Sequence, residues 1–459
     1  MRVLLIAHYF PPDGGAGSQR PASFAQHFPS LGAEITVVCR QLDDGKRGVY
    51  EPADRTLVER TAQARIRRAV ALDGETWTSA LLREAREAVR VERPDIIVVT
   101  LSPFEHAEVG FAIQREFGIP VVLDLRDPWA LDGWHTYRHH FQWRAALATM
   151  RHALESADGV VMNVPGARTA AETIAPRRGK LPYGVVTNGW EESDFAQTPD
   201  VPVSNKLRIR FAGTFVCRFM NDRSLLRQMR ALLRGRGESI DERGRSPLYL
   251  LGALKWMRDE HFGPAAEDFM LEIAGAREAQ TDEIIAESGC ADSVRQVGYL
   301  PHNESARFIS GADVLLLPMH GLRRGARARM VPGKLYEYLG TGRPILGLCP
   351  DGDARDWILR DPRSRVGYPT HVLSIARKLR EMHAMWRNGE YVHSRRPEWV
   401  HEFSRRTQAQ RMVDYLSQVI EQSRAPFCSQ ACSQACSQAC SQVCSQVCEQ
   451  APAPRRSAA

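Results

Sequence analysis

The sequence predicts an α/β protein of two domains, each built on a parallel β-sheet covered by helices. Continuous apolar runs of strand length alternate with helical stretches, which is typical of strands buried on both faces. The alternation occurs twice, and the polar, Pro-containing residues 188–206 separate the two series. A chain of 459 residues is long enough for two large cores.

The first domain is expected over residues 1–200. Its helix candidate at 78–92 has apolar residues at helical spacing and is rich in good helix formers. The opening apolar run has one Arg and no small-residue cleavage site, so we interpret it as a strand and not as a signal peptide. The strand candidates are the apolar runs at 3–10, 33–39, 95–100, 120–125 and 159–163.

The second domain is expected over residues 206–394, with helix candidates at 224–233 and 333–340. Residues 395–424 are expected to form a helical segment that crosses back to the first domain. Residues 425–459 contain a four-residue Cys-Ser-Gln repeat and are interpreted as a disordered low-complexity tail. The strand candidates are the runs at 208–213, 270–276, 295–300, 313–318 and 343–349.

The charge balance is mildly basic and uneven. The formal net charge is +7, although the residues up to 205 hold 23 basic and 26 acidic side chains, so the basic excess lies in the second half. No basic–aromatic stripe or recognised module is present, and we expect no nucleic-acid partner. The basic, partly amphipathic residues 55–72 indicate either peripheral contact with a membrane or an ordinary solvated helix.

Cysteine usage and hydropathy bear on the cellular compartment. Six of the ten cysteines lie in the C-terminal repeat, and the other four are scattered, which favours a reducing cytoplasm over a disulfide framework. No apolar run approaches the ~20 residues that span a bilayer. We therefore expect a cytoplasmic protein, with peripheral contact at the inner face of the cell membrane as an extension of that hypothesis.

A glycine-rich loop follows the first predicted strand. Gly15 and Gly17 let the backbone approach a bound group, and the helix that begins near Arg20 favours an anion. The dinucleotide-binding pattern does not fit, because its third glycine would be Arg20 and the second strand ends at Arg40 instead of an acidic residue. The alternative is a long flexible surface loop.

Charged side chains follow two other predicted strands of the first domain. Arg126 and Asp127 come after the run at 120–125, and His106 comes shortly after the run at 95–100. Ligands of open α/β sheets bind at the carboxyl ends of the strands, so these three residues are catalytic candidates. The alternatives are an Asp–Arg pair that braces a loop and a histidine with a purely structural role.

The second domain offers a site for a diphosphate. Gly213 and Thr214 end its first strand, and Arg218 follows them. A helix that starts after Pro332–Gly333 carries Lys334 and Glu337 in its first turns. A helix N-terminus beside cations suits a pyrophosphate, and a carboxylate one turn further can accept two ribose hydroxyls. The preceding arginine loop contains Arg323, Arg324, Arg327 and Arg329; the alternative is a solvated basic loop.

Taken together, these segments resemble the family 4 glycosyltransferases, which have the GT-B fold. The resemblance covers nearly all of residues 1–420 and rests on the order and spacing of its motifs. They are YFPPDGGAGSQR, LSPFEH, LDLRDPW, VVTNGWEESDF, RIRFAGTF, VGYLPHNESARFISGADVLLLP and VPGKLYEYLGTGRPIL. It implies two Rossmann-like domains that face each other across a cleft, with the acceptor on the first and the nucleotide-sugar donor on the second.

The resemblance also implies roles for individual residues. Glu337 looks like the glutamate that binds the donor ribose, and Lys334 and Leu335 lie at the helix start facing the diphosphate. Arg218 resembles the cation that neutralises the departing phosphate. Gly15 and Gly17 resemble the loop that closes on the donor phosphates. Gly213, Thr214 and Arg329 are expected to lie around the donor, and Asn188–Gly189 resemble the motif on the hinge side.

The chain departs from the family pattern at two places. Arg329 stands where many relatives have a first glutamate, and Arg126 with Asp127 stands where many have a histidine. The Asp351–Gly352–Asp353 triplet resembles a metal-binding pattern of another glycosyltransferase fold, but it follows a second-domain strand and is interpreted as a turn.

The expected function is therefore a metal-independent, retaining, hexosyltransferase-like enzyme without a cofactor. Its donor would be a UDP- or GDP-linked sugar, and its acceptor a glycan, a lipid-linked sugar or a small molecule of cell-envelope biosynthesis. The alternatives are a sugar-nucleotide epimerase of similar fold and a non-catalytic nucleotide-sugar-binding protein.

Overall fold

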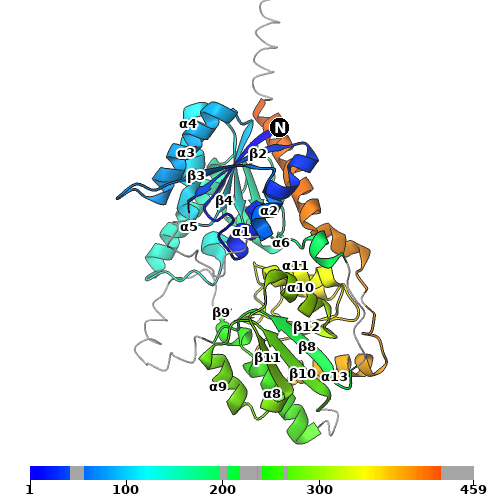
Figure 1. Ribbon diagram of the computed structural model, residues 1–459. Helices are drawn as coiled ribbons and strands as arrows, with labels where there is room; N and C mark the ends of the chain where they lie inside the picture. The colour runs from blue at the N-terminus through cyan, green and yellow to red at the C-terminus, as the bar shows by residue number, and fades with distance from the viewer. Residues whose placement is uncertain are drawn as a thin grey trace, which may run out of the picture.

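The protein has two α/β domains stacked end to end (Figure 1). The computed structural model describes residues 1–41, 56–196, 204–217, 235, 240–261, 267–393 and 395–424. The predicted helix at 224–233 and the low-complexity residues 425–459 lie outside the described residues. The prediction of two Rossmann-like domains is confirmed by the strand order of both sheets.

The first domain contains a seven-stranded sheet whose strands all pair in parallel. Its order is β3-β2-β1-β4-β5-β6-β7, so the direction of strand addition reverses between β1 and β4. The strands are β1 (Arg2–Ala7), β2 (Glu34–Arg40), β3 (Arg65–Ala69), β4 (Ile96–Leu101), β5 (Val121–Leu125), β6 (Gly159–Met162) and β7 (Gly184–Val185). The open ends beyond β1 and β4 are the expected ligand position of such a sheet.

Helices cover both faces of this sheet. Val3 and Leu5 of β1 pack toward α1 and the C-terminal helix, whereas Leu4 and Ile6 pack toward α3 and α4, as alternation along a strand requires. The helices are α1 (Ala16–His27), α2 (Thr56–Arg60), α3 (Trp77–Glu92), α4 (Ala107–Phe117), α5 (His140–Ser156) and α6 (Pro165–Ile174).

The second domain repeats the arrangement with a six-stranded parallel sheet of order β11-β10-β8-β12-β14-β15. Its strands are β8 (Leu207–Ala212), β10 (Phe269–Ala274), β11 (Val294–Gly298), β12 (Val314–Pro318), β14 (Ile345–Leu348) and β15 (Arg365–Gly367), and β9 (Ile240–Asp241) pairs separately with β13 (Gly321–Leu322). Its helices are α8 (Leu248–Trp256), α9 (Ala279–Glu287), α10 (His302–Ser310), α11 (Gly333–Thr341), α12 (Asp353–Ile358) and α13 (Val372–Arg387).

The chain crosses between the domains twice. After α13 it returns along the second domain, and the helix of residues 405–424 packs on the first domain (Figure 1). Met412, Leu416 and Val419 join the core beneath β1. The Tyr415 hydroxyl accepts a hydrogen bond from Val160 N at 3.0 Å, which ties this helix to β6.

A buried tryptophan connects the two crossings. Trp190 N donates to Phe403 O at 3.1 Å, and Arg405 N donates to Trp190 O at 2.9 Å. The Trp190 ring packs against Gly340 of α11, where an added Cβ would come within 2.9 Å of it. The joint thus fixes α11 relative to the first domain.

The structure differs from the sequence-based expectation at residues 55–72. Residues 65–69 form β3 at the edge of the first sheet, and the only helix of this segment in the described residues is the short α2. Arg67 forms an ion pair with Glu84 of α3, and Arg65 forms one with Glu92 of the same helix. The alternating basic residues therefore belong to an edge strand and not to an amphipathic helix.

Candidate functional site

The largest cavity among those described lies between the domains and has a volume of about 550 Å³. The first domain contributes the loop before α1 and the first turns of α1, and the second domain contributes the carboxyl ends of its strands and the start of α11. The lining includes Gly15, Gln19, Gly213, Thr214, Arg245, Gly275, Tyr299, Ser305, Pro332, Lys334 and Glu337. Five of the predicted donor-binding residues therefore meet in one place: Gly15, Gly213, Thr214, Lys334 and Glu337.

Glycines at the strand ends make room for the lysine of α11. Gly213 has φ +140°, and a Cβ added to it would lie 2.3 Å from Lys334 Cε. A Cβ added to Gly275 would lie 2.2 Å from Gly213 O, so two backbone segments also approach closely here. Only glycine at position 213 allows the Lys334 side chain to lie across the strand end.

The amino end of α11 points its first turn at the cavity. Pro332 is the N-cap, without a side-chain hydrogen bond that would satisfy the first backbone donors. Burial lowers the pKa of the Lys334 ammonium, and the nearby Glu337 carboxylate acts in the opposite direction. Glu337 itself forms no hydrogen bond or ion pair with the described residues, so its oxygens are available to a ligand.

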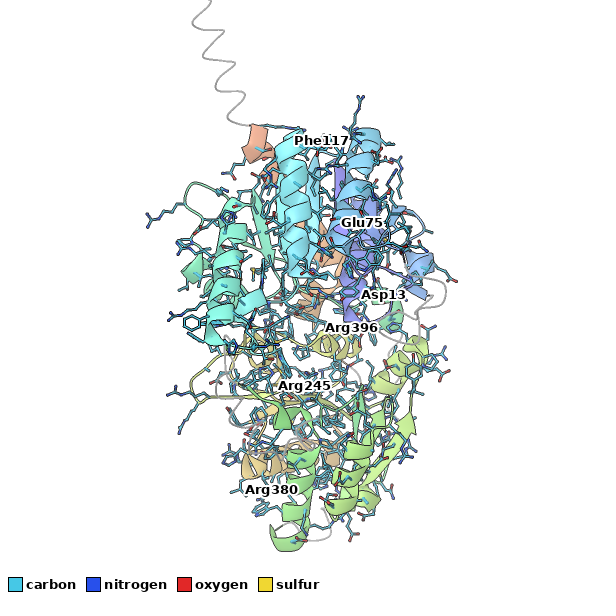
Figure 2. The ribbon with its side chains drawn as sticks, turned by 90° about the vertical axis from the view of Figure 1, so that its left-hand side faces the viewer. Asp13, Glu75, Phe117, Arg245, Arg380 and Arg396 are labelled. Carbon is cyan, nitrogen blue, oxygen red and sulfur yellow. The ribbon has the colours of Figure 1, made fainter. Side chains whose placement is uncertain are left out.

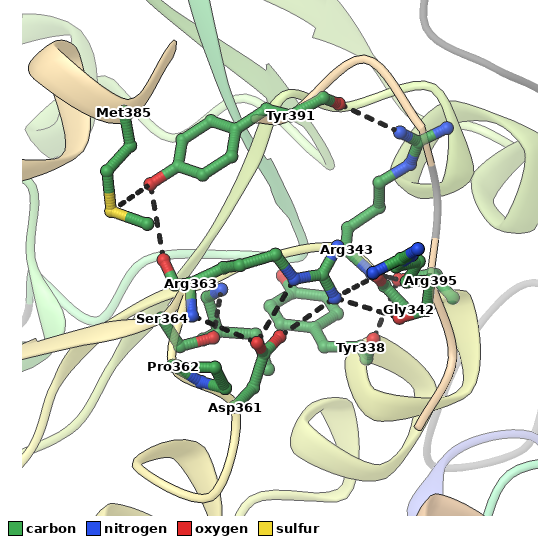
Figure 3. Close-up of polar contacts among 12 residues, drawn as sticks. Tyr338, Gly342, Arg343, Asp361, Pro362, Arg363, Ser364, Met385, Tyr391 and Arg395 are labelled. Carbon is green, nitrogen blue, oxygen red and sulfur yellow. Dashed lines mark hydrogen bonds and ion pairs between the residues drawn. The ribbon is translucent and has the colours of Figure 1, made fainter. Parts of the chain in front are cut away.

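The carboxyl end of α11 is held by a network of buried arginines (Figure 3). Arg343 donates from Nε to Ser310 O at 2.8 Å, and Arg363 donates to Gly342 O at 3.0 Å. Tyr391 O accepts from Arg343, and Asp361 orients Arg363 through two hydrogen bonds. This network lies behind α11 and fixes the helix that presents Lys334 and Glu337.

Arg245 is a cavity residue that the sequence did not reveal. Figure 2 shows it at the boundary between the domains, and its guanidinium carbon lies 4.7 Å from the centroid of the Trp134 ring of the first domain. Burial lowers the pKa of Arg245, and Arg245 helps to lower the pKa of His320 to about 4. Arg245 and Lys334 thus bring two cations to a cavity in which Glu337 is the only acidic residue among the described lining residues.

A histidine–aspartate pair follows the β5 end of the first domain. The Asp132 side chain is only 2% exposed. Its carboxylate accepts a hydrogen bond from His135 Nδ1 at 2.6 Å and hydrogen bonds from two backbone N–H groups. The hydrogen bond to Asp132 raises the pKa of His135, whose side chain is 45% exposed. The ring of His135 meets the edge of Phe104, which stacks on Trp129 at 4.7 Å and 5°. These groups place a histidine, a carboxylate and an aromatic pair together at the loop after β5 of the first domain.

Arg126 and Asp127 lie on the same side. Arg126 donates to Ser102 Oγ at 3.1 Å and covers the Tyr9 ring, and its Nε is 3.8 Å from Asp127 Oδ2. Burial raises the pKa of Asp127, and His135 and Arg126 act against that rise. Arg126 also lies next to the glycine loop. A Cβ added to Gly17 would come within 2.5 Å of the Arg126 Nη1 atom.

Other predicted residues are placed differently. His106 is buried and hydrogen-bonded to His8 at 2.9 Å and Thr78 at 3.1 Å, and burial lowers its pKa. Leu335 has its side chain in the core, and its N–H donates to Pro332 O. Arg329 binds Leu131 O of the first domain at 3.2 Å and does not line the cavity. Arg218 lies outside the described residues.

The remaining motifs have structural contacts. Gly189 lies against the backbone of the second crossing, and its carbonyl accepts from Arg405 at 3.2 Å. In the Asp-Gly-Asp triplet, Asp353 Oδ2 accepts Gly166 N of α6 at 2.8 Å, while Asp351 pairs with Arg355. The described residues contain no group of three or more His, Cys, Asp or Glu side chains arranged to hold a metal ion.

Sequence comparison identifies one family. Residues 15–184 match the family described as glycosyl transferase 4-like domain. No curated protein sequence matches the chain. The match covers the glycine loop, the strand ends with Arg126 and Asp127, and the Asp132–His135 loop.

Solved structures of known proteins share the whole two-domain arrangement. Sucrose-phosphate synthase from Thermosynechococcus elongatus superposes with a TM-score of 0.63 at 13% identity, covering 92% of this chain and 99% of that one. The lipopolysaccharide outer core galactosyltransferase WaaB gives 0.57 at 13%, covering 91% and 99%. A putative UDP-N-acetylglucosamine 2-epimerase from Listeria monocytogenes gives 0.53 at 14%, covering 92% and 96%. These likenesses show that the fold is GT-B.

Proposed function

Since residues 15–184 match the glycosyl transferase 4-like domain and the fold is GT-B, we propose that this chain is a family 4 glycosyltransferase that moves a hexose from a nucleotide-sugar to an acceptor hydroxyl with retention of anomeric configuration. The donor occupies the interdomain cavity, and the acceptor approaches from the side of the first domain. The family match and the fold support glycosyl transfer in general. The donor and the acceptor are proposed from the residues of the site.

The observation that carries the proposal is the charge of the cavity. Lys334 and Arg245 are brought together in a partly buried space, and within the described part of the chain Glu337 is the only acidic residue that lines it. The start of α11 adds unsatisfied backbone N–H groups. Two cations and a helix N-terminus suit a diphosphate, and Glu337, one turn further, suits the ribose hydroxyls. A UDP- or GDP-linked sugar has both groups.

The arrangement also suits the chemistry of transfer. As the bond between the anomeric carbon and the phosphate oxygen breaks, positive charge develops on the sugar and negative charge on the diphosphate. Lys334, Arg245 and the α11 N-terminus stabilise the departing diphosphate electrostatically. The acceptor oxygen then bonds to the anomeric carbon from the same face, and its proton passes to the departing phosphate oxygen. No resident cofactor is needed for this step.

The acceptor side has features of a carbohydrate site. The partly buried Phe104 ring, which stacks on the buried Trp129, offers an aromatic surface, and His135 and Asp127 offer polar groups next to it. We therefore assign the acceptor as a glycan or lipid-linked sugar of the cell envelope, handled at the cytoplasmic face of the membrane. A likeness that accords with this assignment is the one to WaaB, whose title names a lipopolysaccharide galactosyltransferase. No helix of the described residues has the length and apolarity to cross a bilayer.

Nucleotide binding tests the donor assignment directly. UDP and GDP should be compared by thermal shift, and the diphosphate that raises the melting temperature titrated calorimetrically. Glu337→Ala should weaken its binding at least ~10-fold, because a buried diol loses its acceptor. Glu283→Ala, an exposed glutamate on α9, serves as the matched control. An unchanged affinity of the Glu337 variant would overturn the ribose assignment.

Product analysis separates transfer from the two alternatives. A transferase with donor alone releases free sugar slowly, an epimerase returns a changed nucleotide-sugar, and a binding protein leaves the donor intact. Activity is expected to persist in EDTA, because Asp353 is already engaged by Gly166 N. Loss of activity in EDTA that Mg²⁺ or Mn²⁺ restores would contradict that expectation.

A further inference from the structure

One stretch of the first domain has an unusual charge pattern. Residues 133–154 contain three arginines and four histidines and not a single aspartate or glutamate. The stretch follows Asp132 directly and comprises most of α5. A run of this length without acidic residues, in a domain whose overall charge is negative, sets this segment apart from its surroundings.

The structure places the stretch on the outside of the molecule. α5 lies on the flank of the first domain, close to the boundary with the second domain (Figure 1). Its inner side is anchored by Met150 and Leu154 in the core and by Trp143, whose Nε1 donates to Ala130 O at 2.9 Å. Its outer side carries Phe141, which is 79% exposed and is the most exposed large apolar side chain of the described residues.

The cations around Phe141 are unpaired. Arg138 and Arg144 are exposed and form no ion pair with any described residue, and His139 and His140 lie beside them in the sequence. Arg151, two turns further, pairs with Glu155 at 2.8 Å. We call Arg138, His139, His140, Phe141 and Arg144 the α5 surface.

Another exposed helix of the same domain shows the contrast. Three arginines of α3 each have a carboxylate partner: Arg83 pairs with Glu75, Arg86 with Glu116 and Arg90 with Glu87. On α3, carboxylate partners therefore neutralise these arginines. The α5 surface keeps its positive charge and surrounds an exposed aromatic ring with it.

A phenylalanine among unpaired cations is complementary to an anionic lipid surface. The ring enters the boundary between headgroups and acyl chains, and each nearby arginine adds ~1 kcal/mol of attraction to anionic headgroups. A second copy of the same surface is disfavoured by like charge. The position favours lipid as well, since the loop that leads into α5 carries the Asp132–His135 pair on the acceptor side of the cleft.

We propose that the α5 surface docks on a bilayer rich in anionic lipid, with Phe141 inserted at the headgroup level and Arg138 and Arg144 on the anionic headgroups. Docking holds the acceptor side of the cleft next to the bilayer, where a lipid-linked acceptor would be presented. The inference deepens the proposed function and rests on it for that purpose, but the lipid contact itself requires no catalysis.

Co-sedimentation with vesicles tests the proposal on the full chain. Binding is expected to vesicles with about 30% phosphatidylglycerol, not to pure phosphatidylcholine, and should be released by about 0.5 M salt. Arg138→Glu with Arg144→Glu should weaken binding at least ~10-fold, and Phe141→Ala ~5-fold or more. The matched control combines Arg377→Glu with Leu373→Ala, which removes an exposed arginine and an exposed apolar residue from α13.

The outcomes separate this inference from the proposed function. Each variant is first checked for the thermal shift given by UDP or GDP, which reports an intact cavity. The proposal is overturned if the wild-type chain does not bind the anionic vesicles, if it binds both vesicle types equally, or if the α5 variants bind like the wild type. Binding of the α5 surface to homopolymer RNA without vesicle binding would likewise assign it to another partner. Vesicle binding without any nucleotide effect would instead count against the donor assignment alone.

Discussion

The guanidinium carbon of Arg245 lies 4.7 Å from the centroid of the Trp134 ring, so a cation–π contact between the two domains borders the interdomain cavity. Arg245 belongs to the segment between β9 and α8, and Trp134 to the loop after β5. The same Trp134 ring meets His320 edge-on at 5.2 Å. The orientation of a cavity cation in the second domain therefore depends on an aromatic residue of the first.

The first prediction concerns this contact. Arg245→Lys should weaken binding of the nucleoside diphosphate about 10-fold, because a lysine keeps the charge but loses the planar stacking and the fork of donors. Trp134→Leu should weaken the same binding by a smaller factor, about 3-fold, by releasing Arg245. Calorimetric titration measures both, and Arg243→Lys, two residues away and exposed, should bind like the wild type. If the same variants weakened the binding of a nucleoside without phosphates by equal factors, Arg245 would not act at the diphosphate.

The second prediction concerns the strand-end glycine. Gly213→Ala places a methyl group 2.3 Å from Lys334 Cε at φ +140°, so the lysine must move away from the cavity. We expect at least ~10-fold weaker nucleotide binding and a loss of about 1–3 kcal/mol of stability from backbone strain. Gly118→Ala provides the comparison, since its φ is +68° and nothing lies within 4 Å of the added Cβ. It should lose stability without any change in nucleotide binding.

The third prediction concerns pH. The hydrogen bond to Asp132 raises the pKa of His135, so the folded state holds this proton more tightly than the unfolded state does. Its stabilising contribution is complete below the unfolded value of about 6.5 and is lost as pH rises through the folded-state pKa. The melting-temperature difference between wild type and His135→Gln should therefore be largest near about pH 6 and shrink toward about pH 9. A constant difference in melting temperature across that range would show that the pair does not titrate.

The fourth prediction separates the two aspartates of the Asp-Gly-Asp triplet. Asp353→Ala should cost about 1.5–3 kcal/mol of stability, because the carboxylate accepts the Gly166 N–H across the domain boundary. Asp351→Ala should change stability by less than about 0.5 kcal/mol, since Asp351 is exposed and pairs only with Arg355. Chemical denaturation measures both. Equal costs at the two positions, or a shared loss of metal-dependent activity, would contradict the interdomain role.

The sequence predicted most strands and the donor helix because their signals are local. β1, β4 and β12 are continuous apolar runs, and the start of α11 is marked by Pro332–Gly333. β7 and β15 have two and three residues, too few for any periodicity to register. β3 was missed because its basic alternation also fits a solvated helix.

The sequence predicted candidate site residues only where charged side chains or glycines follow a predicted strand or begin a predicted helix. Lys334 and Glu337 share one helix start that follows an arginine loop, so the sequence suggested a diphosphate site there. Arg245 gave no local signal, because its partner Trp134 is distant in sequence and approaches only after both domains fold. The spacing of Asp132 and His135 was a usable signal, since three residues in a tight loop allow the carboxylate to hold the ring. His106 looked functional at a strand end but is buried on His8 and Thr78.

The C-terminal helix has a consequence for how the chain is made. Residues 405–424 complete the core beneath β1, so the first domain cannot bury Val3 and Leu5 fully until the ribosome has synthesised the second domain and this helix. A fragment cut at the joint near residue 196 would expose that apolar face, whereas the second domain has its own core beneath β8. The two domains are therefore separate in architecture but depend on each other during synthesis. The second domain can complete its core before the first domain can.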